Sequence, residues 1–463
     1  MPRHLSRPAR IVVSIAALIL FWQLILPPVV GVANNGDFGK LLDRFRLGGP
    51  NEFQYISTRY VVDQRNHFQS GYWSSELVLI WPMLQINTVI SKDGSFDLRL
   101  MGVIQGSLFL LAIALFVPLL AGLNRSMRMA ICAAVLFMFC DFAYVGYFNS
   151  FYMDVSAYLF LVLAVVVYLR VVRWRRRSDS IMLVICCALV IASKAQHAIL
   201  SVWFAVLFWA ARDILWSARR AAAGVVPVAL LLGGWVVFRS SAPADYTAKN
   251  EFNVIFFQIL PHARDVDGAL RELRLDDSYR MWIGTHAYSQ GSRLEDPAFY
   301  VPFLQRVSYG RIALFYLKHP TDAYRALRTS LDEAGRYRMP MGNFDVGSGQ
   351  PPLAESRSFC GWSDLKRHLY HHHGARLLFS FLGLASLVAA LLGANRGNLP
   401  TGAVVGGIVF ILMAVTEMVV SALGDVFDPT RHQLLFFAQF DLLLLAAIWL
   451  ANRSWALRRL RHS

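Results

Sequence analysis

Residues 153–177, MDVSAYLFLVLAVVVYLRVVRWRRR, predict both the fold class and the direction of the chain. The apolar run 153–169 is close to the roughly 20 residues that cross a bilayer as a helix, and it leads into a run of arginines. Loops rich in Lys and Arg lie on the cytoplasmic side of a membrane. This stretch therefore predicts a transmembrane helix with residue 153 outside and residue 177 inside.

Similar apolar runs recur along the chain. We expect spans at 11–31, 102–122, 129–147, 153–169, 180–193, 198–211, 222–238, 377–394, 401–421 and 433–451. Of the 463 residues 56% are hydrophobic and only 16% are charged, which excludes a soluble enzyme, a fibre and a disordered chain. The sequence predicts an all-α polytopic membrane protein, a bundle of about ten transmembrane helices with both termini in the cytoplasm.

The formal net charge of +15 is concentrated in the segments that this topology places in the cytoplasm. Their basic residues are Arg3, Arg7, Arg10, Arg125, Arg128, Arg170, Arg173, Arg175, Arg176, Arg177, Arg212, Arg219, Arg220, Arg396, Arg453, Arg458, Arg459 and Arg461. Only Asp179 and Asp213 oppose them there. The charge excess is therefore a topology signal, and we expect a lipid bilayer and no nucleic acid as a partner.

Three segments allow alternative interpretations. Residues 76–90 and 298–317 are also apolar, but the second contains Arg306 and Arg311, which are costly at the bilayer centre. We expect both to be interfacial or packed amphipathic helices. The first span follows several arginines, and the alternative interpretation is that it is a signal peptide. A run of about 20 residues is long for a signal peptide.

The topology divides the chain into three parts. Residues 1–238 form an N-terminal transmembrane module with a large first outer loop (32–101), residues 239–376 form an extracytoplasmic, mostly helical lobe, and residues 377–463 contain the C-terminal transmembrane helices and a basic tail. Residues 342–358, rich in Gly, Pro and Ser, predict a mobile loop. The short cytoplasmic loops leave no room for a nucleotide-binding domain, so we expect extracytoplasmic chemistry with a lipid carrier as donor.

Polar residues follow the first span directly, in the stretch 33–40, ANNGDFGK. The carboxylate of Asp37 can approach both a lipid-linked sugar and a water-borne acceptor there, and partial burial would raise its pKa towards that of a working base. Asn35 is a candidate substrate ligand beside it. The alternative is that Asn35 and Gly36 form a turn and Asp37 caps the next helix.

The turn that joins the third and fourth spans contains Asn149, Ser150 and Asp154 among aromatic residues. Each polar group at that depth needs a partner, so we interpret Asn149 and Asp154 as candidates that position acceptor or sugar. Asp154 is either a second acid near Asp37 or a helix-start carboxylate that offsets the helix dipole.

The next outer turn, 193–197, carries two candidate cations, Lys194 and His197. Both are suited to hold a departing phosphate, since they lie side by side in a turn that faces outward. Snorkelling of the long side chain towards the membrane surface would by itself explain Lys194.

The last outer turn, 424–433, gathers Asp425, Asp428, Arg431 and His432 before the final span. A cation at a helix N-terminus is unfavourable for the empty helix but favours a bound anion such as a phosphate. We therefore interpret Asp425, Arg431 and His432 as substrate-binding candidates. The alternative is an ion pair between Asp428 and Arg431 that only closes the turn.

Three carboxylates, Asp141, Glu417 and Asp441, fall inside predicted spans and are functional candidates by their position. No paired metal-ligand spacing appears, and the adjacent histidines at 371–373 would point to different faces of a helix. We expect no metal site and no cofactor.

The segments described above resemble the WsfD-like glycan-biosynthesis hexosyltransferases and, more broadly, the GT-C superfamily of integral-membrane glycosyltransferases. The matching pieces, in chain order, are NNGDF at 34–38, YFNSFY at 147–152, FNVIFF at 252–257, VSYG at 307–310, GDVFDPTRH at 424–432 and FD at 440–441. The resemblance implies that Asp37 stands where such enzymes keep the catalytic base, and that the sugar comes from a polyprenyl-phosphate carrier. The sequence departs from the family pattern at two positions, and both departures keep the charge. The acidic residue that usually follows the Asn-Ser-Phe stretch appears here as Asp154, and Arg431 stands where a lysine is more common.

We therefore expect an inverting glycosyltransferase at the outer face of the bacterial cytoplasmic membrane. It would move a sugar from polyprenyl phosphate to a hydroxyl of a cell-surface glycan, a glycolipid or a pilin-like protein. The alternatives are a transporter or flippase of lipid-linked glycans and a polymerase or ligase. A transporter would show broken spans or paired halves near the midplane, whereas the polar residues here gather at one surface.

Overall fold

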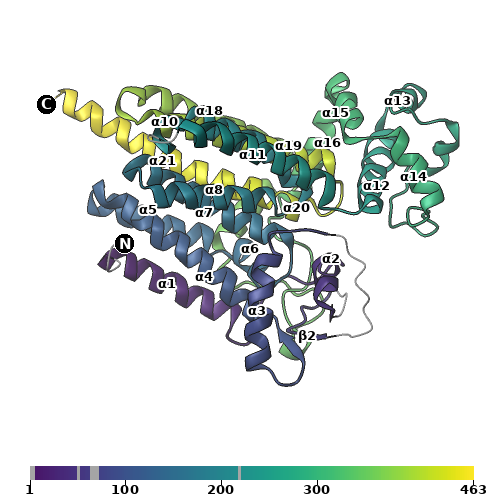
Figure 1. Ribbon diagram of the computed structural model, residues 1–463, viewed down its shortest axis with the longest axis horizontal. Helices are drawn as coiled ribbons and strands as arrows, with labels where there is room; N and C mark the ends of the chain where they lie inside the picture. The colour runs from purple at the N-terminus through teal and green to yellow at the C-terminus, as the bar shows by residue number, and fades with distance from the viewer. Residues whose placement is uncertain (1–5, 50–52, 63–71, 217–219, 463) are drawn as a thin grey trace.

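The computed structural model describes residues 6–49, 53–62, 72–216 and 220–462. Arg3 and Arg219 of the basic set lie outside the described residues, as do the side chains of Arg220, Arg458, Arg459 and Arg461. Long helices run side by side as a bundle (Figure 1). The first helix begins, and the last helix ends, at the same end of this bundle.

Seven helices within the described residues are long and apolar enough to cross a membrane. They are α1 (Arg7–Leu24), α4 (Arg99–Phe116) with its extension η2 (Val117–Gly122), α7 (Met153–Trp174), α11 (Arg220–Ser240), α18 (Gly374–Ala394), α19 (Thr401–Gly424) and α21 (Leu434–His462). The pair α5 (Arg125–Phe139) and α6 (Phe142–Val145) with η3 (Gly146–Phe148), bent by 51°, is an eighth candidate. The predicted all-α polytopic membrane fold is confirmed.

Helix α7 is the centre of the bundle, because it packs against α4, α8, α19 and α21. Its apolar residues occur all round the helix, as expected for a helix enclosed by neighbours, and 83% of its most apolar window is buried inside the protein. The apolar stretch that begins at residue 153 thus forms the core around which the other helices pack.

Two of the ten predicted spans are too short to cross a bilayer alone. They correspond to α8 (Arg177–Ile191, 15 residues) and to η4 (Ala195–Ile199) with α9 (Leu200–Ala210). A helix of 15 residues rises only about 22 Å, against roughly 30 Å of hydrocarbon. Both segments are apolar, so hydropathy predicts them as spans. The turn between them lies inside the protein, however, where Ser193 and His197 are buried. A short α10 (Arg212–Leu215) follows α9.

The first outer loop folds into a small lobe with a three-stranded antiparallel sheet, which the sequence reading did not predict. Its elements are α2 (Gly39–Leu42), η1 (Asp43–Phe45), β1 (Leu47–Gly48), β2 (Arg59–Val62), α3 (Leu77–Ile90) and β3 (Ser95–Asp97). The rings of Phe38 and Tyr60 pack 5.5 Å and 5.1 Å from Phe151. This aromatic contact fixes the segment around Asp37 against the start of α7.

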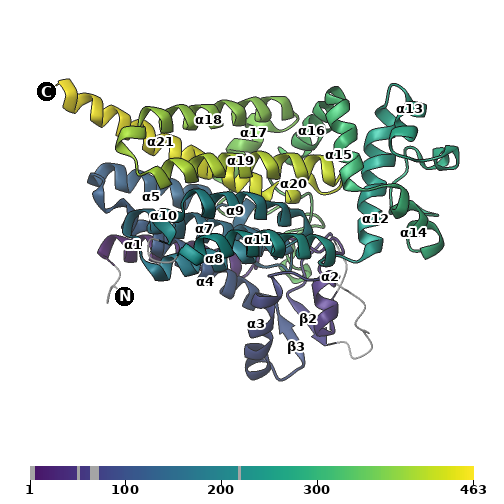
Figure 2. The same cartoon turned by 45° about the horizontal axis from the view of Figure 1, so that its top comes forward.

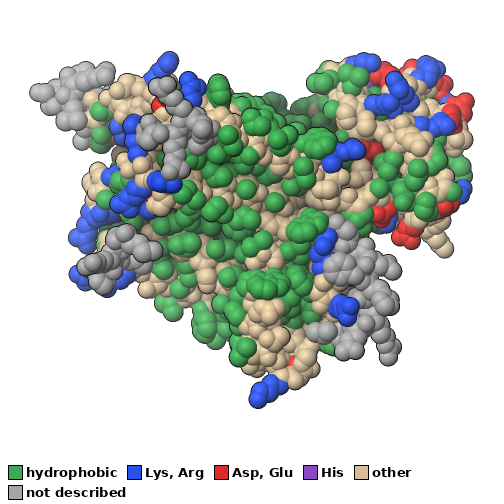
Figure 3. Space-filling view, viewed as in Figure 1, with side chains coloured by type: hydrophobic (Ala, Val, Ile, Leu, Met, Phe, Trp, Pro, Cys, Tyr) green, Lys and Arg blue, Asp and Glu red, His purple; other side chains and the backbone are tan. Residues whose placement is uncertain are grey.

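The second outer segment forms a separate helical lobe at the end of the bundle away from the termini (Figures 1 and 2). Its elements are α12 (Ala244–Phe252), the π-helix η5 (Asn253–Ile259), η6 (Leu260–His262), α13 (Val266–Glu272), η7 (Asp277–Trp282), α14 (Pro297–Arg306) and α15 (Tyr309–Lys318). Phe252, Phe256 and Phe303 lie in its own apolar core. Figure 3 shows acidic and basic side chains on this lobe, whereas the bundle presents a broad apolar surface with basic side chains at the far end.

The chain then returns from this lobe to the bundle. Helix α16 (Pro320–Ala334) packs on α18 and α19, and α17 (Gly361–Tyr370) packs on α5. The remaining elements are η8 (Val346–Ser348), η9 (Arg396–Asn398) and α20 (Pro429–His432).

The predicted mobile loop, residues 342–358, is instead tied to the first outer loop. Gly31 donates a backbone hydrogen bond to Asn343 (3.1 Å), Ala33 donates to Gly342 (3.1 Å) and Gly342 donates to Phe53 (2.8 Å). A Cβ atom at Gly342 would collide with the carbonyl of Gln54. The glycine therefore serves this close backbone approach, where composition alone suggested a loose loop.

Candidate functional site

Charged residues from four separate segments meet where the bundle adjoins the two outer lobes. Asp37 comes from the start of the first outer loop, Asp154 from the first turn of α7 and Lys194 from the turn before η4. The connection between α19 and α21 supplies the fourth group, which includes Arg431. We call this set the Asp37–Arg431 cluster.

Arg431 lies at the centre of the cluster and is only 3% exposed. Its Nη1 atom donates to Asp37 Oδ2 at 2.5 Å and lies 3.5 Å from Asp154 Oδ2. Its Nη2 atom lies 3.3 Å from Asp428 Oδ2, so the turn-closing pair also forms. The guanidinium lies 4.8 Å from the centre of the Tyr152 ring. One buried cation thus joins carboxylates that are far apart in the sequence.

Local turns orient Asp37. Its backbone N–H donates to Asn35 Oδ1 at 3.1 Å, and Asn34 Oδ1 accepts from Gly36 and Phe38 at 2.8 Å and 3.2 Å. Such Asx turns hold a short loop in one conformation. The Asn35 side chain also donates to Asp428, which links the first outer loop to the α19–α21 connection.

The carboxylate of Asp37 is 16% exposed and contacts a second cation, Lys40, whose Nζ lies 2.6 Å from Oδ1. Burial by itself would raise the pKa of Asp37, but the charges of Arg431 and Lys40 outweigh it and hold the pKa well below its ordinary value. This differs from our expectation of a raised pKa. The reason is that the neighbouring cations stabilise the carboxylate more than desolvation destabilises it.

Lys194 and His197 both face Asp154. Lys194 Nζ lies 3.3 Å from Asp154 Oδ1, and His197 Nε2 lies 3.8 Å from the same oxygen. His197 Nδ1 lies 3.0 Å from Glu417 Oε1 of α19. The buried turn therefore faces two carboxylates, Asp154 and Glu417. Glu417 belongs to the site as the partner of His197.

Asp425 and His432 complete the cluster. His432 Nδ1 lies 3.2 Å from Asp425 Oδ2, and its Nε2 lies 3.2 Å from Arg431 Nη2. Burial raises the pKa of Asp425 to about 6. Burial, together with the charges of Lys194 and Arg431, lowers the pKa of His432 well below its ordinary value, so this imidazole is neutral.

The cluster leaves several of its buried nitrogen atoms without a hydrogen-bond partner in the described part of the chain. These are His197 Nε2, Arg431 Nε and His432 Nδ1, the last lying close to Asp425 but not in hydrogen-bonding geometry. Buried polar atoms are normally satisfied. These three nitrogen atoms leave the cluster able to accept a further hydrogen-bond partner.

The site contains Lys40, which the sequence did not single out, although it follows Asp37 by three residues, a spacing that often brings side chains together. Asp428, predicted only as a turn-closing partner of Arg431, and Glu417, a candidate by its position in a span, also belong to the site. One predicted residue is missing from it. Asn149 does not belong to it. Its Nδ2 donates to the carbonyls of Leu24 and Val30 at 2.9 Å and 2.8 Å, which fixes the end of α1.

A second buried cluster joins α6, α17 and α21. Three groups donate to Asp441 Oδ2: Tyr144 (2.7 Å), Trp362 (2.7 Å) and Lys366 (2.9 Å). Lys366 also lies 4.3 Å from the centre of the Tyr337 ring. Asp141 caps α6 and accepts from the backbone of Ser363 at 2.9 Å. These contacts hold α17 on the bundle.

Within the described residues, no group of three or more His, Cys, Asp or Glu side chains could hold a metal ion. The chemical groups that the site offers are buried cations and a partly exposed carboxylate.

Comparison with known proteins places the chain in one family. The model of the YfdI N-terminal transmembrane domain matches residues 3–462, whereas no curated protein and no solved structure matches. Because this match covers nearly the whole chain, the protein belongs to the YfdI N-terminal transmembrane domain family.

Proposed function

We propose that this protein is an inverting glycosyltransferase of the GT-C type that transfers a sugar from a polyprenyl-phosphate carrier to an acceptor hydroxyl. The resemblance to WsfD-like hexosyltransferases supports the proposal, together with the cluster of cations around Asp37. The acceptor is a cell-surface glycan, a glycolipid or a pilin-like protein.

In the proposed step, Asp37 accepts the proton of the acceptor hydroxyl. The hydroxyl oxygen forms a bond to the anomeric carbon, and the bond from that carbon to the phosphate oxygen breaks with its electron pair. The products are the inverted glycoside and polyprenyl phosphate. Positive groups placed where the negative charge develops are a large source of rate acceleration. Lys194 and Arg431 are the cations placed to act on the departing phosphate, beside the neutral imidazole of His432.

The observation that carries the proposal is the contact between Asp37 and Arg431 in a cluster with unpartnered donors. A base paired with a cation is weak, because its pKa is low. A bound phosphate would share the charge of Arg431 and so raise the pKa of Asp37. Donor binding would thereby prepare the base for its proton transfer.

The same proposal assigns each end of the bundle to one side of the membrane. Basic side chains gather at the end that carries the termini, and the Asp37–Arg431 cluster lies at the other end (Figures 1 and 3). If the basic end is cytoplasmic, the cluster faces outward. In this arrangement the lobe formed by α12 to α15 covers the acceptor, and the apolar bundle receives the polyprenyl tail.

A carrier or flippase is less well supported. The only bent pair among the candidate spans of the described residues breaks between α5 and α6, where Asp141 caps the new helix at 2.9 Å. That break adjoins the cluster around Asp441 rather than the Asp37–Arg431 cluster. It is therefore explained by local capping and by the attachment of α17.

The test is the substitution Asp37→Asn, assayed in membranes with labelled polyprenyl-phosphate hexose. We expect sugar transfer to fall by about 10²–10⁴-fold, the usual contribution of a general base, at unchanged expression. Asp97→Asn, which breaks a partly exposed pair with Arg99 in the same outer loop, is the matched control and should transfer normally. Full transfer by Asp37→Asn would exclude Asp37 as the base.

A further inference from the structure

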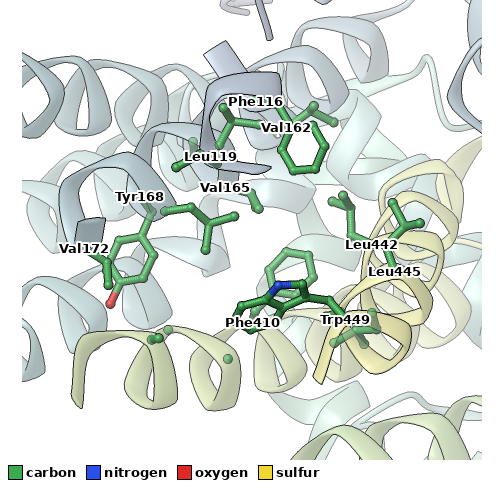
Figure 4. A pocket seen from close by; sticks show the side chains of 18 of the residues that line it. Phe116, Leu119, Val162, Val165, Tyr168, Val172, Phe410, Leu442, Leu445 and Trp449 are labelled. Atoms are coloured by element: carbon green, nitrogen blue, oxygen red, sulfur yellow. The ribbon is translucent and has the colours of Figure 1, made fainter. Parts of the chain in front are cut away.

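A cavity of about 550 Å³ lies inside the bundle, between α7, α19 and α21. Figure 4 shows Val162, Val165, Phe410, Leu442 and Trp449 around it. Along α7 its lining begins at Leu161, about two turns beyond Asp154, and ends at Arg173. The cavity is therefore separate from the Asp37–Arg431 cluster and extends towards the basic end of the bundle.

The depth of the cavity matches one leaflet of a bilayer. From Leu161 to Arg173 on α7, and from Leu442 to Arg453 on α21, the lining extends for about 17–18 Å at 1.5 Å per residue. The hydrocarbon core of a bilayer is roughly 30 Å thick, so one leaflet accounts for about half of that distance. A single hydrocarbon chain of one leaflet thus has the length of this cavity.

The basic end of the cavity carries two arginines, Arg173 and Arg453. Arg173 donates to the carbonyl of Leu119 at 3.2 Å, and Arg453 donates to the carbonyl of Asn398. Within the described residues neither forms an ion pair, whereas the nearby Arg170 lies 3.1 Å from Asp179. Arg453 Nε is buried without a hydrogen-bond acceptor. Two uncompensated cations at the mouth of an apolar space are complementary to a lipid with an anionic headgroup.

We propose that this cavity binds one acyl chain of an anionic glycerophospholipid from the leaflet at the basic end, with its phosphate between Arg173 and Arg453. Water is a poor occupant, because an apolar cavity offers it no polar partners. The lipid chain would complete the packing between α7, α19 and α21. Its headgroup lies at the opposite end of the bundle from the proposed donor phosphate, so this site and the proposed reaction are independent.

The experiment is native mass spectrometry of the purified protein after exposure to vesicles of phosphatidylglycerol or phosphatidylcholine. We expect one phosphatidylglycerol to be retained, with about a tenfold preference over phosphatidylcholine, because the choline cation of phosphatidylcholine offsets the charge of its phosphate; this preference is about that of one hydrogen bond to a charged group. The double variant Arg173→Gln/Arg453→Gln should lose the preference. Ala446→Phe, which fills the cavity, should lose the retained lipid while remaining folded. Arg212→Gln, an exposed arginine that does not line the cavity, is the control and should behave as the wild type.

Three results would overturn the proposal. Equal retention of phosphatidylcholine would show that the site does not select an anionic headgroup. Unchanged retention by Ala446→Phe would show that the lipid does not bind in the cavity. Displacement of phosphatidylglycerol by polyprenyl phosphate, one for one, would assign the cavity to the donor instead. Because the readout is lipid binding, none of these results bears on whether Asp37 is the catalytic base.

Discussion

The Asp37–Arg431 cluster and the cluster around Asp441 both bury a carboxylate beside a cation, but they differ in access. The Asp37 side chain is 16% exposed, whereas those of Asp441 and Lys366 are 0% and 3% exposed. Loops and helix ends from distant parts of the chain supply the first cluster. The second lies between packed helices, where Tyr337 and other aromatic rings surround the lysine.

Because of this difference in access, we call the Asp37–Arg431 cluster the open cluster and the cluster around Asp441 the sealed cluster. We interpret the first as a functional site and the second as a contact that stabilises the fold. In the open cluster, nitrogen atoms of Arg431, His197 and His432 lack a hydrogen-bond partner among the described residues. In the sealed cluster, three donors converge on Asp441 Oδ2, and Asp441 Oδ1 is itself buried without a partner among the described residues. A ligand can approach the first set and complete it, while the second set is closed to solvent. We therefore expect changes in the open cluster to affect transfer and changes in the sealed cluster to affect stability.

The largest effect on stability is expected from Lys366→Met. It leaves the buried Asp441 charge unpaired, and breaking a buried pair in this way costs about 3–5 kcal/mol. The free energy of unfolding in detergent micelles measures the effect, and the rate per folded molecule should not change. Lys366→Met/Asp441→Asn removes both charges and should regain most of the loss. A single variant as stable as the wild type would show that the pair does not stabilise the fold.

The comparison is sharpened by Lys194→Met in the open cluster. Lys194 lies 3.3 Å from Asp154, and we propose that it also contacts the donor phosphate. Loss of a hydrogen bond to a charged group is worth about 1.5–3 kcal/mol, so the KM for the lipid-linked donor should rise by about 10–100-fold. Initial rates over a range of donor concentrations measure it.

Lys318→Met is the control for this experiment, because its pair with Glu272 lies on the exposed helical lobe. It should leave the KM unchanged. A rise in KM for both variants would point to general damage to the outer lobes rather than to a phosphate contact.

The sequence predicts most of the bundle, because hydropathy and arginine placement depend on local composition. It also predicts Asp37 and Arg431 as site residues. It misses Glu417 as the partner of His197, since a carboxylate in an apolar helix gives no sign of the helix it faces. It predicts that Asn149 positions acceptor or sugar, whereas its amide donates to two backbone carbonyls. Tertiary contacts of this kind depend on packing between segments, which one sequence does not specify.

A smaller effect is expected from Asn35→Ala. Asn35 accepts from the backbone of Asp37 at 3.1 Å and donates to Asp428, so its loss loosens the base without removing a charge. A hydrogen bond between neutral groups contributes about 1 kcal/mol, which corresponds to about fivefold in kcat. Asn35→Ser keeps an acceptor for the turn and should recover part of the rate. An equal loss in both variants would assign the effect to the contact with Asp428.

The smallest effect is a pH dependence that arises from Asp425. Burial raises its pKa to about 6, above the value of an unfolded chain, so the folded protein binds this proton more tightly. Its contribution to stability is therefore complete below about pH 4 and is lost as the pH rises through about 6. The neutral carboxyl also removes one negative charge from the cluster, so the donor phosphate should bind about two- to fivefold more tightly at pH 5 than at pH 7, the modest size expected for a partly exposed charge. Donor affinity measured across this range should lose its slope in Asp425→Asn. A slope that persists in that variant would place the titrating group elsewhere in the open cluster.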